Sequence, residues 1–145
     1  MKRLFLAMAV VSLLISCLGG IIETEIPGMP KIENVRILGY DQSSGGYVEK
    51  YTFQSSGDWP YLEFTVYDDD IDINEITITL YNNVYPGGEK AFTFDLYQYD
   101  SPQICRYLIP ITQSEDNFWY LQFFVTDING KRSKTHESDI FKVLP

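Results

Sequence analysis

The chain has 145 residues, 15% of them aromatic, with 20 acidic and 11 basic side chains and a formal net charge of −9. This length suits a single domain, and the excess of negative charge disfavours binding to nucleic acids or anionic lipid surfaces. Two cysteines and one histidine leave little material for disulfide bridges, His-rich metal sites or Cys–His catalysis.

The chain opens with the pattern of a secretory signal. Lys2 and Arg3 give a positive start, and residues 4–15 are almost entirely apolar. This run is too short for a membrane span, which needs about 20 apolar residues. It ends with the small residue Ser16 directly before Cys17. We therefore expect residues 1–16 to form a signal helix that is cleaved between Ser16 and Cys17.

The sequence Leu-Ile-Ser-Cys at positions 14–17 resembles the lipobox of bacterial lipoproteins. The resemblance implies that the Cys17 sulfur receives a diacylglyceryl group and that fatty acyl chains, palmitate among them, anchor the protein to a membrane. In bacterial lipoproteins, an aspartate directly after the lipidated cysteine keeps the protein from being sorted to the outer membrane. This chain has Leu18 at that position, so the same resemblance favours the outer membrane if the organism has one. An unlipidated secretory signal and a retained membrane anchor are the alternatives.

Residues 17–30 hold three glycines and two prolines without a sustained period, which predicts a flexible tether. Residues 31–145 form the predicted domain, in which short alternating apolar runs are separated by turn residues and show no helical period. We expect strands near 31–38, 47–55, 61–67, 74–82, 91–98, 104–112, 118–127 and 139–144.

Alternation within these runs predicts one apolar and one polar face per strand. The longest apolar stripe consists of Trp119, Leu121, Phe123 and Val125, and we expect it to face the core. Strands with a single apolar face stack as two antiparallel sheets. Seven or eight such strands predict an all-β fold, an antiparallel β-sandwich.

The segment YLQFFVTDINGKRS at residues 120–133 resembles the penultimate strand and D-x-x-G turn of immunoglobulin-like and fibronectin type III-like bacterial surface domains. Residues 62–72 resemble their early strand followed by an acidic loop. The resemblance implies an immunoglobulin-like order, in which strands 74–82 and 118–127 are neighbours. The chain departs from the antibody pattern because no cysteine pair bridges the sheets. Such domains host very different functions.

The turn at residues 68–75 holds six acidic or amide side chains. Calcium takes six to eight oxygen ligands, so Asp68, Asp70 and Asp72 are candidate calcium ligands. The alternative is an acidic turn capped by its own aspartates. The glycine and glutamate that an EF-hand loop requires are missing from their positions.

Three further residues carry specific expectations. Cys105 is in phase with the apolar positions of its strand, so we expect a buried side chain in the core rather than a reactive thiol. We expect His136 to lie in a loop. Pro110 cannot donate to a β-ladder, which places the strand 104–112 at a sheet edge or gives it a bulge.

No nucleophile elbow, phosphate-binding loop, zinc pattern or dinucleotide fingerprint appears, so we expect no enzymatic activity and, apart from the calcium considered above, no cofactor. Tyr81, Tyr120 and Phe124 fall on the outward face of two neighbouring strands, and clustered surface aromatics are typical of binding sites. The alternative is that the chain's own segments cover them.

The predicted function is that of a lipid-anchored module at the cell envelope that binds a protein or glycan partner. The alternatives are a structural envelope lipoprotein without a specific ligand and a calcium-dependent accessory domain.

Overall fold

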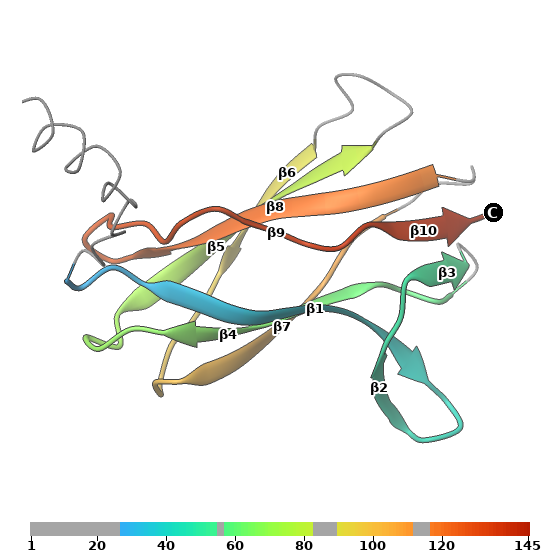
Figure 1. The fold of residues 1–145 in the computed structure, drawn as a ribbon. Helices are drawn as coiled ribbons and strands as arrows, with labels where there is room; N and C mark the ends of the chain where they lie inside the picture. The colour runs from blue at the N-terminus through green and yellow to red at the C-terminus, as the bar shows by residue number, and fades with distance from the viewer. Residues whose placement is uncertain (1–26, 55–56, 83–89, 112–116) are drawn as a thin grey trace, which may run out of the picture.

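The computed structural model describes residues 27–54, 57–82, 90–111 and 117–145, and all regular structure in them is β-strand. These ranges contain ten strands, which form two stacked sheets (Figure 1). The predicted all-β sandwich is confirmed. Ser16 and Cys17 lie outside the described residues, as does most of the predicted tether. Within the described ranges no helix has the length and hydropathy to cross a membrane.

The first sheet, called sheet A here, has four antiparallel strands. In spatial order they are β2 (Gly46–Glu49), β1 (Lys31–Asp41), β4 (Tyr61–Tyr67) and β7 (Gln103–Leu108). The polar turn between β1 and β2 is tied down by Asp41, whose carboxylate accepts hydrogen bonds from Ser43 and Ser44. These bonds hold the pKa of Asp41 down at about 2. Gly45 in the same turn has a φ of +66°, which glycine adopts without steric cost.

The second sheet, sheet B, is built around the long strand β8. In spatial order it contains β3 (Thr52–Gln54), β10 (Phe141–Leu144), β8 (Asn117–Asp127), β5 (Ile73–Asn82) and β6 (Lys90–Asp95), and the short strand β9 (His136–Glu137) also pairs with β8. Of the strands in the described ranges, only β3 and β10 pair in parallel. The predicted neighbours 74–82 and 118–127 correspond to β5 and β8, which pair along nearly their whole length. β8 therefore has β5 and β10 as its neighbours in the middle of the sheet.

The core lies between the two sheets and contains the predicted stripe on β8. Trp119, Leu121, Phe123 and Val125 are all buried. The rings of Phe64 on β4 and Phe123 on β8 lie 5.2 Å apart and join the sheets at the centre. Fully buried Phe, Leu, Ile and Val side chains from both sheets surround this pair, so apolar packing holds the domain together without a disulfide.

The predicted strand at residues 47–55 is wrong in one respect, because the chain changes sheets within it. β2 pairs with β1 in sheet A, and β3 pairs with β10 in sheet B. Lys50 and Tyr51 form the crossing between the layers (Figure 1). The chain returns to sheet A through residues 57–60, which lead into β4. Two crossings therefore lie close together at this side of the sandwich.

Two smaller predictions are settled by the strand boundaries. β7 is an edge strand of sheet A, as predicted, but it ends at Leu108, so Pro110 lies outside the strand and does not account for its edge position. His136 was predicted to lie in a loop, and it lies instead in β9, opposite Phe123 of β8. This two-residue strand was too short to show alternation.

Candidate functional site

The predicted aromatic face lies on the outward side of sheet B. Tyr81 and Tyr120 are directly opposite in the β5–β8 register, and their rings stack 4.9 Å apart with an angle of 11° between the planes. Both side chains are half-buried. Phe124 lies two outward positions further along β8, where the Arg132 guanidinium covers its ring at 3.4 Å from the centre. The structure thus brings Tyr81 and Tyr120 together and places a cation over Phe124.

The acidic turn has a different arrangement from a calcium loop. Asp68 is buried, and its Oδ2 accepts a hydrogen bond from the backbone N–H of Asp72 at 3.3 Å. Asp72 Oδ2 accepts a hydrogen bond from the Asn129 side chain at 2.9 Å, while Asp70 is exposed. Within the described part of the chain, no three acidic, histidine or cysteine side chains gather closely enough to hold a metal ion. The geometry favours the alternative, a turn capped by its own aspartate.

Cys105 is 6% exposed and belongs to the core cluster, as predicted. Burial raises the pKa of its thiol to about 11, with a small opposing effect of the Gln103 amide. Burial, and to a lesser extent Lys134, lowers the pKa of His136. Cys105 lies in sheet A and His136 in sheet B, so the fold gives no support to a Cys–His pair.

A buried carboxylate organises the outward face of sheet A. Glu63 on β4 is 3% exposed although strand alternation predicted it to face solvent. Arg36 on β1 and Arg106 on β7 are its neighbours on either side in the register, and both pair with it. Arg106 Nε donates to Glu63 Oε2 at 3.0 Å. The two guanidinium groups cover the carboxylate and satisfy its charge.

The same arginine supports a group of three tyrosines. The Arg106 guanidinium lies 4.0 Å from the centre of the Tyr47 ring. Tyr47 in turn meets Tyr61 and Tyr40 edge-on, with ring centres 4.9 Å and 5.5 Å away. Burial, followed by a hydrogen bond with Tyr47, raises the pKa of Tyr61. We call Tyr40, Tyr47 and Tyr61 the tyrosine cluster.

A cleft opens beside the tyrosine cluster, where the chain crosses between the sheets. Its volume is about 370 Å³, and aromatic and polar side chains share its walls. Trp59 is 39% exposed and Tyr40 is 49% exposed, so both offer ring surface to a ligand. We call this the aromatic cleft. Its lining residues are Tyr40, Gln42, Lys50, Gly57, Asp58, Trp59 and Tyr61.

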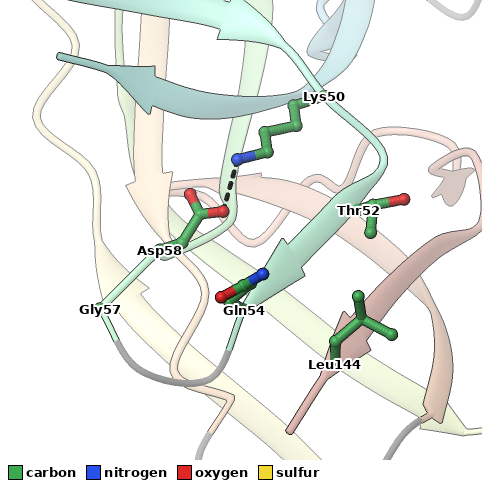
Figure 2. Close-up of a pocket in the computed structure, with 6 residues that line it drawn as sticks. All are labelled: Lys50, Thr52, Gln54, Gly57, Asp58 and Leu144. Carbon is green, nitrogen blue, oxygen red and sulfur yellow. Dashed lines mark hydrogen bonds and ion pairs between the residues drawn. The ribbon is translucent and has the colours of Figure 1, made fainter.

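A second cleft of about 500 Å³ adjoins the first and shares Lys50, Gly57 and Asp58 with it. Figure 2 shows the Lys50 side chain reaching across to the Asp58 carboxylate, with which it forms an ion pair. The remaining walls come from the parallel strands β3 and β10 and consist of Thr52, Gln54 and Leu144. We call this the polar cleft. The Lys50–Asp58 ion pair lies where the two clefts meet.

Sequence reasoning did not identify either cleft. The segment Gly57-Asp58-Trp59-Pro60 and the residue Tyr40 fall between predicted strands, and neither was assigned a role. The available signal was the tryptophan itself, because a large aromatic side chain within a polar turn has no strand face to pack on. No family model matches the sequence, and no curated protein matches it.

Proposed function

We propose that this protein is a lipid-anchored interaction module that binds a protein or glycan partner outside the cytoplasm. The observation that carries the proposal is the aromatic cleft, where Trp59 and Tyr40 keep much of their ring surface exposed. Exposed aromatic surface is costly in water and is enriched at binding sites, where aromatic side chains act as anchors.

The support behind the cleft favours binding over a purely structural role. Glu63 holds Arg106, Arg106 packs on Tyr47, and Tyr47 packs between Tyr40 and Tyr61. A side chain that is held in place before binding loses less conformational entropy when a ligand arrives. This chain of contacts therefore pre-organises two walls of the aromatic cleft.

The position of the clefts suits display from an anchor. β1 begins at the end of the sandwich where the described chain starts, and it runs to the opposite end, where the C-terminus lies (Figure 1). Tyr40 stands near the end of β1, and Leu144, the penultimate residue, lines the polar cleft. A lipid on Cys17 would thus hold the protein by one end and leave the clefts at the other.

The anchor is tested at the acceptor sulfur. Cys17→Ala removes the thiol that lipidation requires, so we expect the precursor to remain uncleaved by the lipoprotein peptidase and to take up no radiolabelled palmitate. If the variant matures to the same mass and still fractionates with membranes, the protein is not a lipoprotein of this kind.

The binding role is tested by site-specific photo-crosslinking in intact cells. A benzophenone amino acid at position 40 lies in the cleft, and the same group at the exposed position 99 is the matched control. We expect one defined crosslinked species from position 40 and none from position 99. Crosslinks only between copies of this chain would favour a structural envelope component, and no crosslink from position 40 would contradict the proposal.

A further inference from the structure

We infer that the aromatic cleft and the polar cleft together bind an uncharged glycan chain. This inference rests on the proposed function and names the ligand class of the same site. It follows from four properties of the clefts: their aromatic faces, their polar groups, their charge and their shape.

The aromatic faces match one side of a sugar ring. Pyranose rings carry axial C–H bonds on one or both faces and hydroxyls around the rim. The C–H face packs on an aromatic ring, because the ring offers a flat apolar surface with a negative face. Trp59 and Tyr40 supply two such rings with exposed surface, and the half-buried Tyr61 also lines the aromatic cleft.

The polar groups match the hydroxyl rim. A sugar hydroxyl both donates and accepts hydrogen bonds, so its binding site needs donors and acceptors close together. Gln42 carries both in its amide, Lys50 donates and Asp58 accepts. Thr52 and Gln54 continue the series into the polar cleft. Hydrogen-bond donors and acceptors are therefore both present in each cleft.

The charge of the site favours an uncharged ligand. Among the described residues that line the clefts, Lys50 and Asp58 are the ionisable side chains apart from the tyrosines, and they neutralise each other in an ion pair. Within that described lining, an acidic polysaccharide would meet a lysine whose charge is already paired, and the formal net charge of −9 would repel it. A neutral glycan encounters neither penalty.

The composition and shape of the clefts favour a glycan over a protein segment. Of the lining residues in the described ranges, Leu144 alone has an aliphatic side chain, so this lining offers little to the buried aliphatic anchor that a protein partner brings. Their volumes of about 370 and 500 Å³ lie in the range of small-ligand sites, about 300–1,000 Å³. Because they share three residues, a linear chain can pass from one to the other across the Lys50–Asp58 pair.

The test applies the full chain, purified in mild detergent, to an array of neutral gluco-, manno-, xylo- and galacto-oligosaccharides and of acidic galacturonate oligosaccharides. The neutral probe with the highest signal is then titrated by calorimetry against three variants. Trp59→Ala and Tyr40→Ala remove the two exposed rings of the cleft. Tyr99→Ala, an exposed tyrosine outside both clefts, is the matched control, and thermal melts check that each variant is folded.

We expect binding to at least one neutral oligosaccharide, weakened by about tenfold or more in Trp59→Ala and in Tyr40→Ala, as for loss of an interface anchor, and unchanged in Tyr99→Ala. No binding to any neutral oligosaccharide overturns the inference, as does a preference for the galacturonates. Binding that survives both cleft variants overturns the site. If only glycan binding fails while the photo-crosslinker at position 40 traps a protein, the interaction module stands with a protein ligand. If both fail, the proposed function fails as well.

Discussion

Asp72 lies where the acidic turn after β4 meets the turn after β8. Its Oδ1 is buried and accepts no hydrogen bond from the described residues, while its Oδ2 accepts one from Asn129. Desolvation, followed by the neighbouring Asp68 and then Asp127, raises the pKa of this carboxyl above its usual 3.8. The fold therefore favours the neutral form of Asp72 more than the unfolded chain does.

The sign of this shift predicts a pH-dependent effect of Asp72→Asn. Because the pKa is raised on folding, the stability that Asp72 contributes is complete below its unfolded pKa and is lost as pH rises through the folded pKa. At neutral pH the amide removes an unfavourable charge and keeps an oxygen for Asn129. We expect the variant to melt at a higher temperature than the wild type at neutral pH, with the difference disappearing in acid.

Thermal melts over a pH series measure this difference. Asp69→Asn, in the same turn but exposed, is the matched control and should change the melting temperature little. A difference for Asp72→Asn that stays constant with pH, or that has the opposite sign at neutral pH, would contradict the electrostatic account.

A melt of the wild type with and without millimolar calcium tests the remaining calcium hypothesis, and we expect no shift.

At the same scale, Glu63 stabilises the outward face of sheet A through its ion pairs with two arginines. Glu63→Gln removes the charge that both Arg36 and Arg106 satisfy. We expect a loss of about 1.5–3 kcal/mol in the free energy of unfolding, the usual range for hydrogen bonds to a charged group. Partly exposed arginines can regain water, which keeps the loss below that of a fully buried pair. Urea denaturation measures it, and an unchanged midpoint would show that the carboxylate is not needed.

At the scale of the element, two serines that follow β8 in the sequence complete part of its hydrogen bonding. Between Ser133 and Ser138 the chain follows β8 without forming a continuous strand. Each serine donates its backbone N–H to a carbonyl of β8 and accepts a β8 N–H with its hydroxyl oxygen. Leu121 and Val125 are the two β8 residues involved. The hydroxyls therefore replace backbone carbonyls that the irregular segment does not supply.

Ser138→Ala is expected to leave the buried N–H of Leu121 without an acceptor. Such an unsatisfied group costs about 1–3 kcal/mol. The free energy of unfolding should fall by about this amount, and the midpoint of urea denaturation should fall with it. Hydrogen exchange at the Leu121 amide should also accelerate relative to the Phe123 amide. Tyr97→Phe, which removes a hydroxyl from a side chain that is 75% exposed, is the control and should change stability by less than about 0.5 kcal/mol. Unchanged exchange at Leu121 would mean that another group accepts the bond.

Many of the strands were predictable, because elements such as β5 and β10 have one buried face and therefore alternate. The stripe from Trp119 to Val125 and the pairing of β5 with β8 followed from alternation and from the resemblance to immunoglobulin-like domains. The change of sheet at Lys50 was not predictable, since β2 and β3 carry the same extended signal whichever sheet they join. Glu63 was missed for a related reason: alternation assigns a face but does not say what covers it.

The clefts could not be predicted from local patterns. Tyr40 ends β1, Lys50 lies in the first crossing, and Trp59 lies in the return crossing. These residues meet only because two chain crossings occur on the same side of the sandwich. The pair Tyr81 and Tyr120 could be predicted, because the register between two neighbouring strands alone brings the two residues together.

At the scale of the whole molecule, the chain carries a large negative net charge, while the charged pair that lines its clefts is neutral. The formal net charge is −9, yet the ionisable groups that line the clefts in the described ranges, other than tyrosines, form one neutral pair. Charges far from a ligand act through solvent and are screened beyond about 10 Å at 0.1 M salt. Their effect on binding therefore depends on the charge of the partner, and salt can distinguish the candidate partner classes.

An uncharged glycan should bind with nearly the same affinity at low salt and at ~0.5 M sodium chloride, because it carries no charge for the acidic surface to attract or repel. Calorimetric titration of the selected neutral oligosaccharide at both salt concentrations measures this, and we expect the dissociation constant to change by less than about twofold. A basic protein partner would be attracted by the net charge of −9, and its affinity would fall steeply with salt. An acidic ligand would bind more tightly as salt screens the repulsion. Only a flat response is consistent with recognition through aromatic rings and hydroxyl hydrogen bonds alone.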